Sequence, residues 1–280
     1  MPNILSTLPR LFRSGLILAG VGYAALAGFA YFLQDRLLYV GASMYLPSLD
    51  PAKRVARKLT SIPDAAHKAW AWVAQPKGRV KATVLFFHGN SKRADKTAGN
   101  YASYFTNRGY RVVFAEYPGY GFREGVSPTH DVVIADAKQL IAAVRARYRE
   151  SPLWVAGESL GAGIAAQVAA EAKPERVLLF TPWYRLSDVA AEDLKFLPVQ
   201  MLLNADYDSC KALAGLAAKT YITYAEQDWI IPAHHARSLI ECLHTPPGHV
   251  IALPGIGHNH WARTLSLGQW DELLAAPGST

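Results

Sequence analysis

Residues 153–172 read LWVAGESLGAGIAAQVAAEA, and this stretch decides the fold that we expect. An apolar run at 153–156 is typical of a buried strand, and the Gly- and Ala-rich run at 160–172 favours a helix. Between them, Gly157-Glu158-Ser159-Leu160-Gly161 matches the G-x-S-x-G turn, in which flanking glycines let a strained serine stand out over a sheet. A serine helix cap beside packing glycines is the alternative. The strand before and the helix after favour Ser159 as a nucleophile.

The chain beyond residue 55 alternates short apolar runs with longer amphipathic ones, which predicts an α/β fold with helices flanking a mostly parallel eight-stranded sheet. Runs after residue 82 are almost wholly apolar, so we expect strands buried on both faces. The first two strands flank Pro63-Asp64 and should form an antiparallel hairpin at the sheet edge. Strands are predicted at 55–62, 69–75, 82–87, 110–115, 153–156, 176–180, 220–224 and 249–253, and helices at 95–107, 131–149, 160–172, 233–243 and 260–275.

One stretch, residues 183–216, breaks this alternation with a longer insertion that contains helical pieces. In an open α/β sheet, an insertion near the carboxyl ends of the strands covers the site. We therefore expect a short helical cap over the active site, and we find no internal repeat or second domain boundary.

A nucleophilic serine needs a base and an orienting acid, which follow the G-x-S-x-G turn in the order Ser, Asp/Glu, His. Asp228 follows the strand at 220–224, and His258 follows the strand at 249–253 within a glycine-rich turn. Both residues therefore lie at carboxyl ends of strands, where they can converge on Ser159. An Asp helix cap and a surface histidine are the alternatives for each residue alone, and their joint order and placement favour a triad.

Other carboxylates and histidines compete for these two roles. Glu226 is close to Asp228 in sequence, and Asp206 and Asp208 fall in the insertion. The strand-end position favours Asp228 over all three. His260 is expected to lie already within the next helix, so His258 is the better base.

Acyl transfer also needs hydrogen-bond donors for an oxyanion. One is expected from the backbone N–H of Leu160, the residue after the nucleophile. The second is expected from the backbone N–H of Asn90, in the His88-Gly89-Asn90-Ser91 loop after the strand at 82–87. An Asn-Ser helix cap is the alternative for this loop. No metal-ligand set stands near it, so we expect neither a cofactor nor a metal.

The N-terminal region contains SGLILAGVGYAALAGFAYFL at 14–33, a charge-free run long enough to cross a bilayer core. A cleaved signal peptide is the alternative, because Ala25-Leu26-Ala27 fits the cleavage pattern, but hydrophobicity continues to Leu33. We expect a basic segment at 1–13, a transmembrane anchor at 14–33 and a membrane-proximal tether at 34–54. An α/β domain follows at 55–280, with the cap at 183–216.

Composition narrows the class of protein and the partners. Hydrophobic residues make up 51% and charged residues 18%, which excludes a disordered or collagen-like chain. The net charge is +7, and the first 58 residues hold seven basic and two acidic side chains, so most of the excess flanks the apolar run. This placement favours an anionic membrane surface over nucleic acid. The two cysteines, Cys210 and Cys242, allow at most one disulfide.

Four segments carry a common pattern: Phe86-Phe87-His88-Gly89-Asn90, Glu116-Tyr117-Pro118-Gly119-Tyr120-Gly121, Gly157-Glu158-Ser159-Leu160-Gly161 and Gly255-Ile256-Gly257-His258-Asn259. Together they resemble the α/β-hydrolase superfamily from about residue 34 to 270, in particular its small-cap, membrane-anchored branch with acyl-protein thioesterase-like and serine aminopeptidase-like hydrolases. The resemblance implies that Ser159 is the nucleophile, His258 the general base and Asp228 its orienting acid. It also implies an oxyanion hole at Asn90 and Leu160.

These observations predict a single-pass, membrane-anchored serine hydrolase that cleaves an ester or thioester of a hydrophobic acyl group through an acyl-enzyme. Its partners would be a small-molecule or lipid-like acyl substrate and the membrane, with no nucleic acid. An aminopeptidase-like amide hydrolase is one alternative, in which Glu192 and Asp193 would hold a substrate ammonium. A catalytically silent scaffold is the other. The oligomeric state and the side of the membrane that carries the domain stay open.

Overall fold

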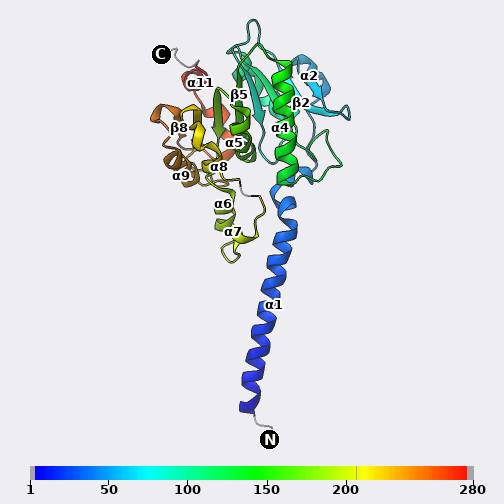
Figure 1. Ribbon diagram of the computed structural model, residues 1–280, viewed down its shortest axis with the longest axis vertical. Helices are drawn as coiled ribbons and strands as arrows, with labels where there is room; N and C mark the ends of the chain where they lie inside the picture. Colours follow the sequence, from blue (N-terminus) through cyan, green and yellow to red (C-terminus); the bar gives the residue numbers. More distant parts are fainter. Residues whose placement is uncertain (1–3, 206, 276–280) are drawn as a thin grey trace.

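The computed structural model, shown in Figure 1, describes residues 4–205 and 207–275, and its centre is an eight-stranded sheet. The strand order is β1-β2-β4-β3-β5-β6-β7-β8. The β1–β2 and β2–β4 pairs are antiparallel, and all other neighbours are parallel. The strands are β1 Thr60–Pro63, β2 Ala69–Ala74, β3 Thr83–Phe87, β4 Arg111–Ala115, β5 Leu153–Glu158, β6 Arg176–Phe180, β7 Thr220–Ala225 and β8 Val250–Leu253.

Helices cover both faces of the sheet. Successive residues of a strand point to opposite sides, so each buried strand packs against helices on both faces. Leu85 and Phe87 of β3 pack in one apolar cluster with α4, α5 and α9, whereas Val84 and Phe86 pack in another with α3, α10 and α11. The predicted sheet with flanking helices is thereby confirmed. These helices are α3 Ala94–Thr106, α4 His130–Arg147, α5 Leu160–Ala172, α9 Ala233–Leu243, α10 Trp261–Thr264 and α11 Leu267–Leu274.

Two predicted elements were wrong in part. The strand predicted at 55–62 is confined to β1, and the residues before it form helix α2, Pro51–Ala56. Asp50 caps this helix by accepting hydrogen bonds from two backbone N–H groups, and Pro51 occupies its first turn. Val55, counted as a strand residue, is instead 77% exposed on this helix.

The helix predicted at 260–275 is interrupted and forms α10 and α11. Ser266 begins α11 with a capping box, in which its side chain accepts from the Gln269 N–H and the Gln269 side chain accepts from the Ser266 N–H. This local cap restarts the helix, a break that the apolar periodicity did not indicate.

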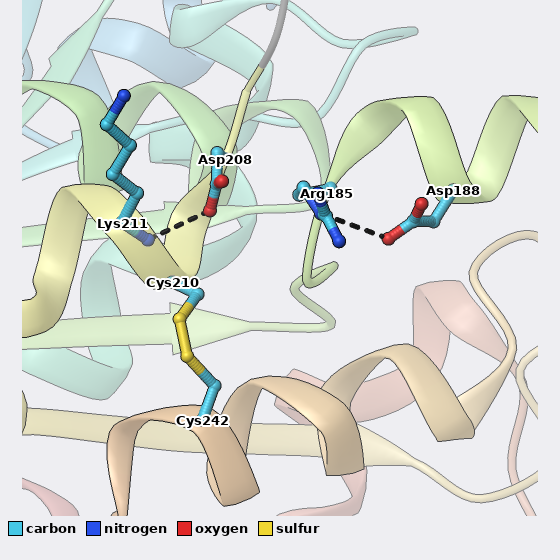
Figure 2. Close-up of a disulfide and its surroundings, with 6 residues drawn as sticks. All are labelled: Arg185, Asp188, Asp208, Cys210, Lys211 and Cys242. Carbon is cyan, nitrogen blue, oxygen red and sulfur yellow. Dashed lines mark hydrogen bonds and ion pairs between the residues drawn. A yellow bond between two sulfur atoms is a disulfide. The ribbon is translucent and has the colours of Figure 1, made fainter. Parts of the chain in front are cut away.

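The insertion at 183–216 is divided between two parts of the molecule. Helices α6 Leu186–Asp193 and α7 Val199–Leu202 extend from the sheet domain on the same side as the long N-terminal helix (Figure 1). Helix α8 Ser209–Leu213 instead packs on α5. Figure 2 shows Cys210 of α8 joined to Cys242 of α9 by a disulfide, with a Cα–Cα distance of 6.2 Å. We refer below to residues 186–204, which comprise α6, α7 and the segments that follow each of them, as the cap.

The N-terminal helix α1, Ile4–Leu38, projects from the domain as one rod (Figure 1). Its residues 14–38 are apolar enough and long enough to cross a membrane, with a mean hydropathy of 1.9 for their most apolar part. The predicted tether at 34–54 contains the end of α1, the short turn η1 Val40–Ala42 and α2. This segment lies against the domain: Tyr39 and Tyr207 share a hydrogen bond of 2.7 Å between their hydroxyls, and the Leu49 N–H donates to Asp95 at 2.8 Å.

Candidate active site

Ser159 lies at the turn between β5 and α5, with a backbone φ of +54° that a non-glycine residue rarely adopts. Its N–H donates to the Phe180 carbonyl at 3.0 Å, which holds the turn against β6. A Cβ atom at Gly157 would collide with the Gly161 carbonyl, and one at Gly161 would collide with the Phe87 carbonyl. Both glycines are therefore required for the tight turn, and a strained backbone of this kind costs about 1–3 kcal/mol. The geometry fits a nucleophile elbow.

His258 and Asp228 form a buried pair beyond the ends of β8 and β7. The His258 Nδ1 lies 2.6 Å from the Asp228 Oδ2, and both side chains are almost fully buried. The other carboxylate oxygen, Oδ1, accepts hydrogen bonds from the backbone N–H groups of Ile230 and Ile231, each at 2.9 Å. These bonds fix the carboxylate so that it favours a proton on Nδ1. The lone pair of the neutral imidazole is then on Nε2, where a base would need it.

Four of the five predicted site residues line one cavity of about 570 Å³, namely Ser159, His258, Asn90 and Leu160. The fifth, Asp228, is bonded to His258. The sheet explains this convergence, because β3, β5, β7 and β8 run parallel and the loops after their carboxyl ends open at the same edge. This arrangement can hold a substrate carbonyl between a serine, an imidazole and two loop backbones.

The Asn90 side chain is held from both ends. Its Nδ2 donates to the carbonyl oxygen of Leu38, the last residue of α1. Its Oδ1 accepts from the Tyr120 hydroxyl at 2.6 Å and from the Gly41 N–H at 3.4 Å. The loop that is expected to supply an oxyanion donor is thus fixed to the end of α1. Sequence reasoning missed these contacts because Leu38 lies 52 residues before Asn90.

His88, one residue before Gly89, anchors the same loop. It is fully buried, with Nε2 3.2 Å from Glu116 and Nδ1 2.8 Å from the Gly89 carbonyl. Its own carbonyl accepts from the Tyr117 hydroxyl at 2.6 Å. Glu116 and Tyr117 belong to one of the four quoted segments, and these bonds show that both residues support the loop.

A partly buried ion pair that the sequence did not indicate adjoins the nucleophile. Lys92 pairs with Glu158, the residue before Ser159, and its Nζ also donates to the Tyr101 hydroxyl at 3.0 Å. Burial opposes the charge on Lys92, but the Glu158 carboxylate and Tyr101 outweigh it and raise the pKa of the ammonium. Burial and the Glu158 carboxylate raise the pKa of Tyr101 to about 12. Lys92 therefore stays charged beside the cavity, where both members of the pair contribute to the wall.

The competing acids occupy other positions. Glu226 lies 4.0 Å from the Arg237 guanidinium of α9. Asp208 caps α8 by accepting from the Lys211 N–H at 2.8 Å. Asp206 lies outside the described residues. His260 is exposed at the start of α10.

The two acidic residues considered for an aminopeptidase, Glu192 and Asp193, have different surroundings. Asp193 lines the cavity, whereas the Glu192 Oε1 lies 2.6 Å from the His234 Nε2 and 3.0 Å from the His235 Nε2 of α9. Glu192 and the two histidines offer ligand atoms within 4.8 Å of one another, so they could hold a metal ion away from the cavity wall. This group was missed because its members come from separate helices. Burial, and then the neighbouring His234, lower the pKa of His235.

Comparison with known proteins supports the same fold. Residues 78–206, less than half of the chain, match the family described as serine aminopeptidase, S33. An uncharacterized protein of Mycobacterium tuberculosis is 27% identical over 234 residues, which cover 82% of each chain. Lysophosphatidylserine lipase ABHD12 of Gallus gallus is 25% identical over 207 residues, covering 63% of this chain and 51% of the lipase.

Among solved structures, the Pyrococcus furiosus esterase Pf2001 superposes with a TM-score of 0.60 at 17% identity. The superposition covers 81% of this chain and 95% of the esterase. At this identity the likeness concerns the fold alone. The chain spans about half the length of the ABHD12 lipase, so the match includes only part of that protein.

Proposed function

Since the chain belongs to the α/β-hydrolase superfamily, we propose that it is a membrane-anchored serine hydrolase that cleaves an ester or thioester of a hydrophobic acyl group. The observation that carries this proposal is the shared cavity of Ser159 and His258, with His258 bonded to a backbone-fixed Asp228. A nucleophile, a base and an orienting acid are the groups that acyl transfer requires.

In the proposed mechanism, Ser159 Oγ attacks the substrate carbonyl carbon while His258 Nε2 takes the hydroxyl proton. Asp228 holds the ring and stabilises the imidazolium that forms. The backbone N–H groups of Asn90 and Leu160 stabilise the developing oxyanion. The tetrahedral intermediate collapses as His258 returns the proton to the leaving alcohol or thiol. Water then attacks the acyl-enzyme with His258 again as base, and this step releases the carboxylic acid and restores Ser159.

The apolar side chains of the cavity wall suit a substrate whose acyl group binds there. Leu38, Trp183, Leu186, Val189 and Ile231 all line it. Apolar walls with a few placed polar groups are typical of sites for hydrophobic ligands. The names lipase and esterase of the similar proteins agree with such a substrate.

An aminopeptidase-like activity is the second candidate, and it rests on Asp193 in the cavity wall and on the name of the matching family. Asp193 could accept a hydrogen bond from a substrate ammonium. Glu192 lies beside two histidines, so Asp193 is the one of these two acids that is available in the cavity wall. The apolar side chains of that wall favour the ester or thioester.

We also propose that α1 anchors the enzyme in the membrane as a single span. Residues 14–38 form 25 residues of continuous helix, and a bilayer core requires about 20. A signal sequence passes the same test of length and composition, so the mature N-terminus distinguishes the two.

The test is hydrolysis of a small panel by the purified full-length protein in detergent. Nitrophenyl butyrate, nitrophenyl decanoate, decanoyl-coenzyme A and an alanine nitroanilide represent esters, a thioester and an aminoacyl amide. We expect turnover of the esters or the thioester and loss of that turnover in Ser159→Ala. Turnover of the amide alone would favour the aminopeptidase, and no turnover of any of them would contradict the proposed function.

A further inference from the structure

An apolar groove lies between the end of helix α1 and the cap. Its walls are Ala30, Leu37 and neighbouring residues on α1, and residues such as Ala190, Leu194 and Leu203 on the cap. Of the described residues that line it, Gln34 alone is polar. From Ala30 to Leu38 the groove follows about two turns of α1.

Gln34 holds the two walls together. Its Nε2 donates to the Leu202 carbonyl at 3.2 Å, and its Oε1 accepts from the Asn204 N–H at 2.6 Å. Both ends of the amide therefore bind the backbone of the cap, and the side chain is buried. These two bonds fix the cap at a set distance from α1, so the groove is a built feature rather than a gap between mobile parts.

The groove continues into the catalytic cavity. Leu37, Leu38, Leu186 and Val189 line both spaces. An extended apolar group that begins at Ser159 can thus pass between α6 and the end of α1 without crossing a polar wall.

The outer end of the groove lies at the level where a membrane surface would be. If the span begins at Ser14, about 20 residues cross the bilayer core, so Ala30 lies within the core and Leu38 outside it. The cap extends on the same side of the domain as α1 (Figure 1), and it carries Phe196 and Met201, which are 62% and 85% exposed. Exposed large apolar side chains at this height suit contact with lipid.

We propose that this groove binds the acyl chain of the substrate, with helix α1 as one of its walls, so that the chain enters from the bilayer between the anchor and the cap. This inference rests on the proposed function for the placement of the acyl carbonyl at Ser159. The anchor then serves as part of the substrate site as well as a membrane attachment, and it favours a single medium or long alkyl chain.

A binding test that does not depend on turnover is photocrosslinking. The full-length Ser159→Ala protein in phosphatidylcholine vesicles is irradiated with a diazirine-bearing dodecanoic acid, and adducts are mapped by peptide mass spectrometry. We expect adducts on α1 near Ala30 and on α6 near Ala190. Ala190→Trp fills the groove and should reduce them at least fivefold, whereas Ala191→Trp, the same change at the next position of α6 outside the groove, should not.

Kinetics with the active protein provide the second arm. Ala30→Trp and Ala190→Trp should each lower the ratio of kcat/KM for nitrophenyl decanoate to that for the butyrate at least tenfold. Ala24→Trp, on an exposed part of α1, is the control for the anchor. Adducts in the groove of Ser159→Ala, together with no ester or thioester turnover by the unsubstituted protein, would support the groove and contradict the proposed function. Adducts that Ala190→Trp does not reduce, or a chain-length ratio unchanged in both groove variants, would overturn the groove.

Discussion

The side chain of Asn90 donates a hydrogen bond to the carbonyl oxygen of Leu38, the last residue of α1. The loop expected to supply an oxyanion donor is therefore bound to the end of α1, the proposed membrane anchor. The neighbouring Gly41 N–H bonds the same side chain. Residues 38–41 are thus part of the support of the site, although they lie in the predicted tether.

The first prediction concerns the anchor. Full-length protein should stay with membranes through high-salt and carbonate washes, because 14–38 would cross the bilayer. A protein beginning at Gln34 keeps Leu38 and Gly41, and it should be soluble and hydrolyse nitrophenyl butyrate. A protein beginning at Ala42 loses both contacts to Asn90, and we expect its kcat to fall at least tenfold. Release of the full-length protein by the washes, or a mature N-terminus at Gly28, would show a removed signal.

The second prediction concerns the acid. Asp228→Asn should lower kcat about 10³- to 10⁴-fold, because an amide cannot hold His258 in the required tautomer or stabilise its imidazolium. Glu226→Gln is the matched control and should keep most of the activity. Both are measured as kcat for one ester, with circular dichroism to show that folding is retained. The opposite pattern would identify Glu226 as the acid.

The third prediction concerns the partly buried Lys92–Glu158 pair. Lys92→Met leaves the Glu158 carboxylate buried without its partner, and we expect a loss of about 2–3 kcal/mol in unfolding free energy. The loss is smaller than for a fully buried pair, because Lys92 is partly exposed. Lys138→Met breaks the exposed Lys138–Glu171 pair and should cost less than about 1 kcal/mol. Denaturant unfolding in detergent measures both, and equal effects would contradict the importance of burial.

The fourth prediction concerns the disulfide. Cys210 and Cys242 are 32 residues apart, so the bond should stabilise the fold by about 3–4 kcal/mol, and we expect a domain with such a bond to face an oxidising compartment. Denatured protein from its native membrane should take up iodoacetamide only after reduction, with two alkyl groups added. Cys210→Ser/Cys242→Ser should unfold at a lower temperature. Alkylation of both thiols without prior reduction would show that the bond is absent.

The sequence predicted the sheet well where local patterns were strong. Strands from β3 onward are nearly continuous apolar runs, and the glycines around Ser159 have a steric role that is readable from the motif. The errors came from competing local signals: the Asp50 cap made a helix of residues near Val55, and Ser266 divided the last helix. In each case a capping hydrogen bond outweighed the apolar pattern.

The contacts that the sequence could not predict join residues far apart in the chain. The Gln34 bond to Asn204, the Lys92–Glu158 pair and the Cys210–Cys242 pairing each depend on the packing of separate elements. No periodicity or motif encodes which polar residue meets which partner across such distances. The Gln34 bond joins α1 to the cap, the Lys92–Glu158 pair joins the loop after β3 to the end of β5, and the disulfide joins α8 to α9.

The most direct measurement of the central claim is the site of covalent labelling by a fluorophosphonate. Full-length protein in detergent is treated with the probe, digested and analysed by mass spectrometry, with Ser159→Ala as the control. The account predicts one rapidly formed adduct on Ser159, none in the variant, and a fall in ester turnover on the order of 10⁴- to 10⁶-fold. A rapidly formed adduct on another serine, or equal labelling of Ser159→Ala, would contradict it.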